Sequence, residues 1–431
     1  MSSDQHVRLR VLAALVALAA AWFAYRGPVR ALREGNYDAA LVYASARAWL
    51  TGHNPYVGAD ASSAWRAAGG PIERDPMSTR AQAVLLYPPA TFVALAPVAA
   101  LPWNTAEIAW TAMNAALWVL TLAWSARLAG LTWGSTAGRT YWALGLAFAP
   151  AHTCVAHGQT AVLAVACAAA GVLLAARGRG AWAGVLLALG AAVKPQVAAL
   201  YIVHQAGRRR WLVAGVAVAA VGVIFALGAW RMSSAGVAWS PAWKGNLDAF
   251  TSLDDGNPTS TNPLRFQLIN LQYLLHTFTD DAGFVRWATV GIVAGLCAAY
   301  FAADLGRSTR RGDLSALAMV GVASLLVTYH RAYDAAILVF ALAWALAVLG
   351  DAEAGGNARR WAWAALACVL VFMVPGASAL NAVQGRLPAW LTGSWAWESL
   401  VMPHAVWALL GLGGVLIASR AGEARSAETP A

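Results

Sequence analysis

The sequence predicts an all-α polytopic membrane protein, a helical bundle of about 10 to 13 transmembrane helices. Its long first outer loop is expected to carry amphipathic helices. Three observations support this fold class. The 431 residues are 60% hydrophobic and only 12% charged, whereas soluble domains carry roughly 25% charged residues. Apolar runs recur along the chain, many of them near the length of about 20 residues that one membrane span needs. Trp occurs 22 times, often near the ends of these runs, as in an aromatic belt.

Candidate spans follow the apolar runs in chain order. The first lies near residues 9–27 and is expected to be retained, because no convincing cleavage site of a signal peptide follows it. Several of the later runs are short or interrupted by Pro, which leaves the number of spans open. These later candidates lie near residues 84–101, 104–128, 141–156, 159–176, 181–206, 211–230, 284–305, 313–329, 333–350, 361–376 and 399–419.

The basic residues indicate the orientation of the chain. All but two of the 30 are arginines, and the formal net charge is +10. Short arginine clusters lie beside the apolar runs, where the positive-inside rule places them in the cytoplasm. We therefore expect a multi-pass protein of the plasma membrane, in contact with membrane lipids and without a nucleic-acid partner.

The polar connections suggest how the chain is organised. We expect one integral membrane domain over residues 1–419, with a first outer loop at 28–82 that carries the catalytic residues and a second long outer loop at 231–282. The remaining residues, 420–431, are polar and are expected to form a disordered cytoplasmic tail.

The middle of the chain allows two topologies. Arginine clusters at both ends of the run 181–206 belong in the cytoplasm, yet only one apolar stretch separates them. A break at Lys194-Pro195 would divide it into two short helices, whereas a single Pro-kinked span would leave one cluster on the wrong side. The break is favoured. It requires that one of the short segments 84–101 or 141–156 does not fully cross.

Asp38 is the first candidate for chemistry. It precedes a helical run in which Tyr43 and Arg47 stand at i and i+4, so an amphipathic helix at the membrane surface is expected. An acid in the first turn of a helix is favoured by the macrodipole, which is the structural interpretation. The functional interpretation is a general base that accepts a proton as a hydroxyl attacks.

The rest of the first loop ends in a turn and a new helix. Gly52-His53-Asn54-Pro55-Tyr56 closes the helical run, with His53 and Tyr56 as candidate substrate contacts. Tyr87-Pro88-Pro89 opens the next apolar run. Pro at the first helical positions explains that motif structurally, and Tyr87 is also a candidate substrate contact.

Further candidates lie inside or between the apolar runs. An ammonium inside an apolar span marks a site unless it snorkels to the headgroups, so Lys194 is a candidate clamp for a phosphate. Gln159 follows Gly158, whose missing side chain allows close backbone approach. In the turn between two late runs, His330 and Arg331 are candidate contacts for a leaving phosphate, with Asp334 orienting one of them.

Other kinds of site find little support. Four scattered cysteines show neither metal spacing nor a disulfide framework. Asp254-Asp255 could bind a metal, but a solvated loop is the favoured interpretation. No phosphate-binding glycine loop and no dinucleotide fingerprint occurs. We expect no cofactor and no metal site, and a donor that resides in the membrane.

The ordered motifs resemble glycosyltransferase family 87. They are Asp-x4-Tyr-x-Ser-Ala-Arg, Gly-x-x-Pro-Tyr, Tyr-Pro-Pro, Gly-Gln at a span start, Ala-Gly-x3-Ala-Leu-Gly-x3-Lys-Pro and His-x3-Asp, over roughly residues 10–350. The resemblance implies a multi-span fold of the GT-C class with its active site on the outer face. It also implies a polyprenyl-phosphate sugar donor, often of mannose, and inverting transfer. Asp38 occupies the position of the base, and Lys194 and His330 match positions near the donor phosphate.

The resulting hypothesis is transfer of a monosaccharide, a mannose-like hexose or a pentose, from a polyprenyl-phosphate donor to a hydroxyl of a lipid or glycan acceptor. Two alternatives remain. A non-enzymatic carrier or flippase for a lipid-linked or anionic substrate would also use an intramembrane cation such as Lys194. An assembly subunit with a vestigial site is the third possibility.

Overall fold

The computed structural model describes residues 3–78, 85–252, 256–304, 310–374 and 376–428. These residues are helical or irregular and form no sheet, which confirms the predicted all-α class. One isolated bridge pairs Leu268 with Arg331. Asp254 and Asp255, considered above as metal ligands, lie outside the described residues.

Within the described residues, six helices are long and apolar enough to cross a membrane, or seven if one bent pair counts as a single span. Four shorter apolar helices accompany them there, so the predicted minimum of ten spans requires that all four also cross, or three of them if the bent pair is one span. The long helices are Gln5–Glu34, Trp103–Ala129, Trp211–Ser234, Ala282–Ala303, Ala332–Gly350 and His404–Gly422, and the bent pair is Gly356–Met373 with Gly376–Gln384. The chain therefore has the make-up of an integral membrane protein.

The chain divides into two compact units, each built from segments far apart in the sequence. Unit 1 comprises Met1–Phe23, Leu122–Pro150 and Pro258–Ala431, and unit 2 comprises Ala24–Thr121 and Ala151–Asn257. The prediction of one domain over 1–419 stays a prediction.

Unit 2 packs short apolar helices against each other through small residues. Helix α10 (Gly180–Val193) contacts α9 (Ala161–Ala176) and α12 (Trp211–Ser234), and α12 contacts α5 (Pro89–Ala99). A Cβ at Gly184 would lie 2.7 Å from the carbonyl oxygen of Val213 on α12. Small residues let membrane helices approach this closely, which explains the Ala- and Gly-rich composition of this region.

The predicted break at Lys194-Pro195 is confirmed. Helix α10 ends at Val193, and α11 (Pro195–Gly207) begins one residue after Lys194, whose φ of −149° and ψ of 80° are not helical. Pro lacks an N–H and disfavours a helical residue before it, yet it fits the first position of a new helix. The sequence Lys-Pro thus ends one helix and starts another.

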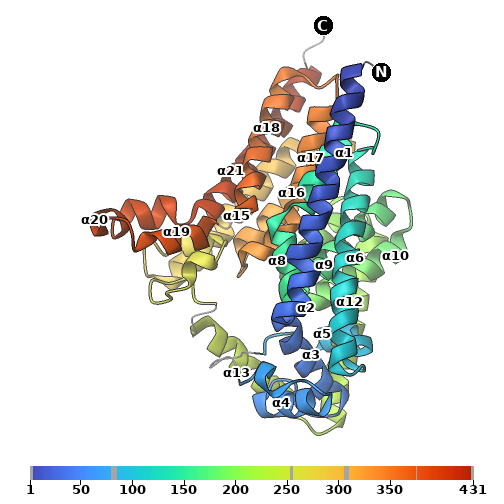
Figure 1. Cartoon of the computed structure of the whole chain (residues 1–431), viewed down its shortest axis with the longest axis vertical. Helices are drawn as coiled ribbons and strands as arrows, with labels where there is room; N and C mark the ends of the chain where they lie inside the picture. The colour runs from blue at the N-terminus through green and yellow to red at the C-terminus, as the bar shows by residue number, and fades with distance from the viewer. Residues whose placement is uncertain (1–2, 79–84, 253–255, 305–309, 375, 429–431) are drawn as a thin grey trace. The chain divides into compact units, whose positions relative to one another are not determined.

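The predicted helix after Asn36 is α3 (Tyr37–Leu50), and it lies deeper than an exposed amphipathic helix would. Ten of its residues are buried. It contacts α4 (Gly58–Ala67) and α5, which lie beside it in the lower part of Figure 1. Its small residues, mostly Ala, allow both neighbours to approach. The N-terminal part of α6 (Trp103–Ala129) completes this side of unit 2.

Two short segments do not form the single spans expected for them. Helix α5 has 11 residues, about 16 Å at 1.5 Å per residue, which is roughly half of the hydrocarbon thickness. The predicted span 141–156 is divided into α7 (Thr136–Leu146) and α8 (Ala149–His157). Pro150 stands at the start of α8, where Pro is tolerated, and would interrupt a continuous helix.

The second long connection is also more helical than predicted. Helix α12 extends to Ser234, and α13 (Trp239–Ser252) follows within the expected loop 231–282. Trp239 and Trp243 of α13 pack with Phe225 of α12. These aromatic contacts hold α13 on unit 2.

Unit 1 is a bundle in which α18 (Gly356–Leu370) packs along α21 (His404–Glu428) (Figure 1). Helix α15 (Ala282–Asp304) contacts α16 (Arg310–Val327), α16 contacts α17 (Val339–Gly350), and α17 contacts α7. Arg139 of α7 donates to the carbonyl oxygen of Leu9 on α1 (Ser3–Ala24). Helices α19 (Gly376–Gln384) and α20 (Ala389–Thr392) extend away from α21 (Figure 1, red).

The expected disordered tail 420–431 needs correction over most of its length. Helix α21 continues to Glu428, and only residues 429–431 lie outside the described part. The segment is rich in Ala, Glu and Arg, all of which favour helix. Polarity alone therefore does not end a helix that a preceding span has already nucleated.

Candidate active site

The first turn of α3 is held by polar contacts of Asn36. This residue precedes the helix, and its Nδ2 donates to Thr111 Oγ1 on α6 at 2.8 Å. Its backbone N–H donates to Glu107 Oε1, also on α6, at 3.4 Å. Gly35, at φ +83°, allows the sharp change of direction between the preceding helix and α3. These contacts fix the position of Asp38 two residues further on.

Asp38, Gln159 and Lys194 form a continuous polar chain inside unit 2. Gln159 Nε2 donates to Asp38 Oδ2 at 2.5 Å, and Lys194 Nζ donates to Gln159 Oε1 at 3.4 Å. Gln159 and Lys194 are both buried. An amide offers a donor at one atom and an acceptor at the other, so Gln159 is suited to join a carboxylate to an ammonium. Three of the predicted site residues are thereby brought together from helix α3 and from two connections between helices, α8 to α9 and α10 to α11.

His157 also lies beside Asp38. It is the last residue of α8, and its Nδ1 is 3.7 Å from the same Asp38 Oδ2. The Asp38 side chain is 12% exposed and the His157 side chain 39%. The Asp38 carboxylate thus lies between the buried amide of Gln159 and the partly exposed imidazole of His157.

Gly158 brings the His157-Gly158-Gln159 segment close to α3. Its φ is +67°, and a Cβ there would lie 2.6 Å from Ala39 Cβ and 3.0 Å from Asn36 Oδ1. Its carbonyl oxygen accepts a hydrogen bond from Trp110 Nε1 at 2.8 Å. Only a residue without a side chain fits this approach, because both the positive φ and the contact with Ala39 disfavour a Cβ.

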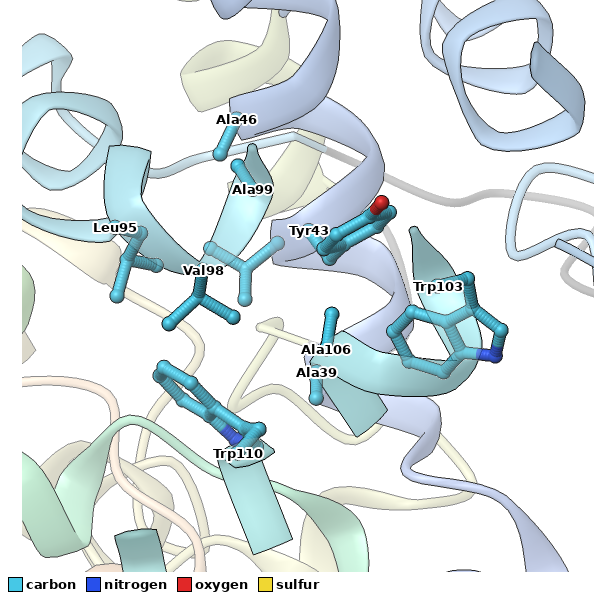
Figure 2. A pocket seen from close by; sticks show the side chains of 10 residues that line it. Ala39, Tyr43, Ala46, Leu95, Val98, Ala99, Trp103, Ala106 and Trp110 are labelled. Carbon is cyan, nitrogen blue, oxygen red and sulfur yellow. The ribbon is translucent and has the colours of Figure 1, made fainter. Parts of the chain in front are cut away.

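An apolar cavity lies between α3, α5 and α6, and Trp110 is one of the residues that line it. Figure 2 shows side chains of all three helices around it, with Trp103 and Trp110 contributed by α6. Its volume of about 10 Å³ is about what one water molecule needs. The cavity is too small for a sugar, and its lining is Ala39, Val42, Tyr43, Ala46, Leu95, Val98, Ala99, Trp103, Ala106 and Trp110.

Two other candidates on α3 bind the end of α5 and the residues after it. Arg47 Nη1 donates to the carbonyl oxygens of Ala99 and Ala100 at 2.8 and 2.9 Å, where a cation stabilises the end of a helix. Tyr43 donates to the Leu101 carbonyl at 2.6 Å and its ring packs against Trp103. Their shared i, i+4 face therefore contacts protein.

The turn after α3 contains two candidate substrate contacts, one exposed and one buried. His53 is exposed, with its Nδ1 3.1 Å from Thr51 Oγ1. Tyr56 is buried, packs against Phe92, and donates to the carbonyl oxygen of Tyr87 at 2.9 Å. Tyr87, also a candidate, is thereby joined to Tyr56 through its backbone.

Burial changes the acidity of the loop tyrosines. It raises the pKa of the Tyr43 hydroxyl, an effect that the nearby Arg47 guanidinium partly offsets. It raises the pKa of Tyr56 more strongly. Both hydroxyls therefore remain protonated hydrogen-bond donors through the neutral range.

The late turn forms a separate polar cluster within unit 1. His330 Nδ1 lies 3.0 Å from Asp334 Oδ2, and both side chains are almost completely buried. The Arg331 backbone N–H donates to the same oxygen at 3.4 Å. Ile269 N–H donates to the His330 carbonyl at 3.0 Å, which ties the turn to the second connection. His330 Nε2 has no hydrogen-bond partner among the described residues.

Sequence reasoning missed the acid on α6. Glu107 accepts from Asn36, and its Oε1 is 3.7 Å from Arg74 Nη1. Its side chain is mostly buried. A lone acid near the start of an apolar run is itself a signal of a site, so Glu107 could have been predicted as a site residue. Its contacts with Asn36 and Arg74 of the first loop could not have been predicted.

Among the residues that the structure describes, no group of three or more His, Cys, Asp or Glu side chains is arranged to hold a metal ion.

A comparison with protein families identifies the family of the chain. The family model described as Glycosyltransferase family 87 matches residues 85–329, more than half of the chain. The matched part contains Gln159 and Lys194, while Asp38 lies before it and His330 directly after it. No curated protein and no solved structure matches the chain.

Proposed function

The chain belongs to glycosyltransferase family 87, which implies sugar transfer, and on this premise we propose that it moves a monosaccharide from a polyprenyl-phosphate donor to a hydroxyl of a lipid or glycan acceptor. The sugar is a mannose-like hexose or a pentose, and its anomeric configuration is inverted. The reaction takes place at the outer face of the plasma membrane. The positive-inside rule, applied to the arginine clusters, supports this face.

The single observation that carries the proposal is the polar chain from Asp38 through Gln159 to Lys194. A carboxylate and an ammonium are the two groups that the reaction needs, one to accept a proton and one to stabilise a phosphate. Their placement in one buried network supports a preorganised site, because fixed charges in a low-dielectric environment stabilise developing charge better than mobile ones in water.

Asp38 acts as the general base in this mechanism. The acceptor oxygen attacks the anomeric carbon of the sugar, and its proton passes to the Asp38 carboxylate as the new carbon–oxygen bond forms. The bond from the anomeric carbon to the phosphate oxygen breaks on the opposite side, and polyprenyl phosphate leaves with the bonding electron pair. The Gln159 amide fixes the carboxylate orientation through one oxygen. Positioned bases of this kind typically contribute about 10²- to 10⁴-fold.

Lys194 supplies positive charge for the leaving phosphate. It stands where α10 ends and α11 begins, so the helix break directs the side chain to Gln159. An ammonium has three donors, and one of them serves the amide. The break also introduces polar backbone into an apolar region, which membrane proteins tolerate where a site is built.

The late turn is proposed, as the sequence predicts, to contact the donor phosphate. Asp334 fixes one ring nitrogen of His330, which supports an oriented imidazole, and Arg331 contributes a neighbouring cation. This part of the proposal concerns unit 1 and is independent of the Asp38 network.

The test is direct identification of the product. Purified protein is incubated with radiolabelled polyprenyl-phosphate sugars and a membrane extract, and labelled products are separated and analysed for the acceptor and the anomeric configuration. We expect label in a new glycoside of inverted configuration. Label that only crosses liposome membranes, still attached to the polyprenyl phosphate, would establish the carrier function instead and refute the transferase.

A further inference from the structure

We propose that His157 is the proton relay of this site, taking the proton from Asp38 after each transfer and releasing it to water. The inference rests on the proposed function, since it assumes that Asp38 is the base. It gives a role to a residue that directly precedes the Gly158-Gln159 pair and that the mechanism above does not use.

The geometry places His157 on the open side of the carboxylate. Its Nδ1 is 3.7 Å from Asp38 Oδ2, and its side chain is 39% exposed while that of Asp38 is 12% exposed. Gln159, which donates to the same oxygen, and Lys194, which donates to Gln159, are both buried. Among the contacts described for Asp38, His157 is therefore the titratable side chain that joins the carboxylate to solvent.

The proton balance of the reaction requires such an exit. The acceptor hydroxyl loses its proton to Asp38, and the carboxyl group must release it before the next turnover. The departing phosphate monoester has a second pKa of about 6, so at neutral pH it leaves largely without that proton. A carboxylic acid is a stronger acid than an imidazolium, so proton transfer from a carboxyl group to an imidazole is favourable, and an imidazole exchanges protons readily with water.

Charged side chains around His157 and Asp38 influence this proton transfer. From α3, the Asp38 carboxylate faces His157 directly, and at the break between α10 and α11 the Lys194 ammonium lies behind the Gln159 amide. Glu107 of α6 and Arg74 pair at 3.7 Å beside Asn36 and largely compensate each other. The imidazole thus faces one anion directly and one cation across a neutral amide.

A structural role for His157 is the competing explanation. A histidine at the end of a helix interacts favourably with the helix dipole when protonated, and the pair with Asp38 would then only hold α8 against α3. The two explanations differ in whether a free base can replace the side chain. A free imidazole can carry a proton but cannot hold a helix in place.

The experiment measures sugar transfer by purified His157→Ala with and without added imidazole. We expect a rate loss of about tenfold or more, substantial recovery with imidazole, and a pH–rate profile whose acid limb differs from that of the wild type. His157→Gln keeps a polar side chain of similar reach and covers the case in which the alanine variant folds poorly. It should also lose rate and should recover less, because its longer side chain partly fills the space that imidazole would occupy.

Controls separate the relay from general effects of imidazole. His6→Ala removes an exposed imidazole at the N-terminus and should match the wild type with or without imidazole. Lys194→Met should lose activity that imidazole does not restore.

Two results would overturn the relay. One is a folded His157→Ala that keeps the wild-type rate and pH profile, and the other is a folded variant whose loss no added base restores. Asp38→Asn is assayed in parallel. Inactivity of Asp38→Asn together with either result removes only the relay, whereas wild-type activity of Asp38→Asn removes the base assignment on which the relay rests.

Discussion

We expect the substitution Gly158→Ala to displace the His157-Gly158-Gln159 segment without changing any polar group of the candidate site. The new Cβ would lie 2.6 Å from Ala39 Cβ, next to Asp38 on α3. Ordinary contact begins near 3.4 Å, so the two segments must separate by about 0.8 Å (3.4 − 2.6). The positive φ of +67° adds a backbone cost of roughly 1–2 kcal/mol.

The displacement is large enough to affect catalysis. A misplacement of about 1 Å can cost on the order of 10²-fold in rate. For Gly158→Ala we expect a loss of about 10- to 100-fold in kcat, equivalent to roughly 1.4–2.7 kcal/mol in the barrier. The loss follows from the position of α3, because Asp38, Gln159 and Lys194 all keep their side chains.

The chain offers a matched control in Gly178. It also has a positive φ, +75°, but a Cβ there would meet no atom within 4 Å. Gly178→Ala therefore carries the same backbone strain without the contact. Initial rates of transfer and thermal unfolding of both variants, followed by intrinsic Trp fluorescence, separate the loss of stability from the loss of activity. We expect both variants to lose stability and only Gly158→Ala to lose its rate.

Equal activity of the two folded variants would refute this reasoning. It would mean that the segment around Gly158 relieves the contact with Ala39 without moving Asp38, or that the position of Asp38 does not limit the rate.

Further predictions concern the polar chain and the first loop. Gln159→Glu places a carboxylate against Asp38, and we expect at least a tenfold loss of transfer, because like charges disfavour the ionised base; an unchanged rate would remove Gln159 from the network. Lys194→Met should raise the KM or Kd for the donor by more than tenfold, since charge-assisted contacts are worth roughly 1.5–3 kcal/mol; Lys244→Met, at an exposed position, is the control and should bind the donor as the wild type does. Burial raises the pKa of Tyr56, so the contribution of this shift to the free energy of unfolding is complete below the unfolded pKa of about 10 and is lost as the pH rises above it. The midpoint of thermal unfolding should therefore fall more steeply above pH ~10 in the wild type than in Tyr56→Phe. Parallel curves of midpoint against pH would contradict this.

The sequence was sufficient for features that depend on neighbouring residues. The helical class follows from the apolar runs, and the break at Lys194 follows from Pro195, whose effect on the preceding residue is local. The helix α3 follows from the run after Asp38. The continuation of α21 to Glu428 was missed because polarity was weighted above helix propensity.

The candidate site was predicted in its residue types but not in its connections. Gln159 and Asp38 are 121 residues apart, and no local pattern indicates that an amide joins a carboxylate to a lysine. The i, i+4 spacing of Tyr43 and Arg47 places them on one face, yet it does not say that this face contacts the end of α5 and the residues after it. Pairings of this kind depend on how helices pack, which the spacing does not contain.

The second acid of unit 2 illustrates the same limit. Glu107 carries a recognisable signal as an acid in an apolar run. Its partners, Asn36 and Arg74, come from the first loop, so its role in holding the turn before Asp38 becomes visible only in the folded chain.

The central claim is that the Asp38 carboxylate accepts the proton of the acceptor. Its most direct measurement compares the transfer rates of purified Asp38→Asn and Asp60→Asn, two isosteric changes in the same loop. Asp60 accepts a backbone hydrogen bond from Asn54 at 2.9 Å, which an asparagine can also accept. We expect Asp38→Asn to fold and to lose about 10²-fold or more, with Asp60→Asn close to the wild type. A folded Asp38→Asn that transfers sugar at the wild-type rate would contradict the account.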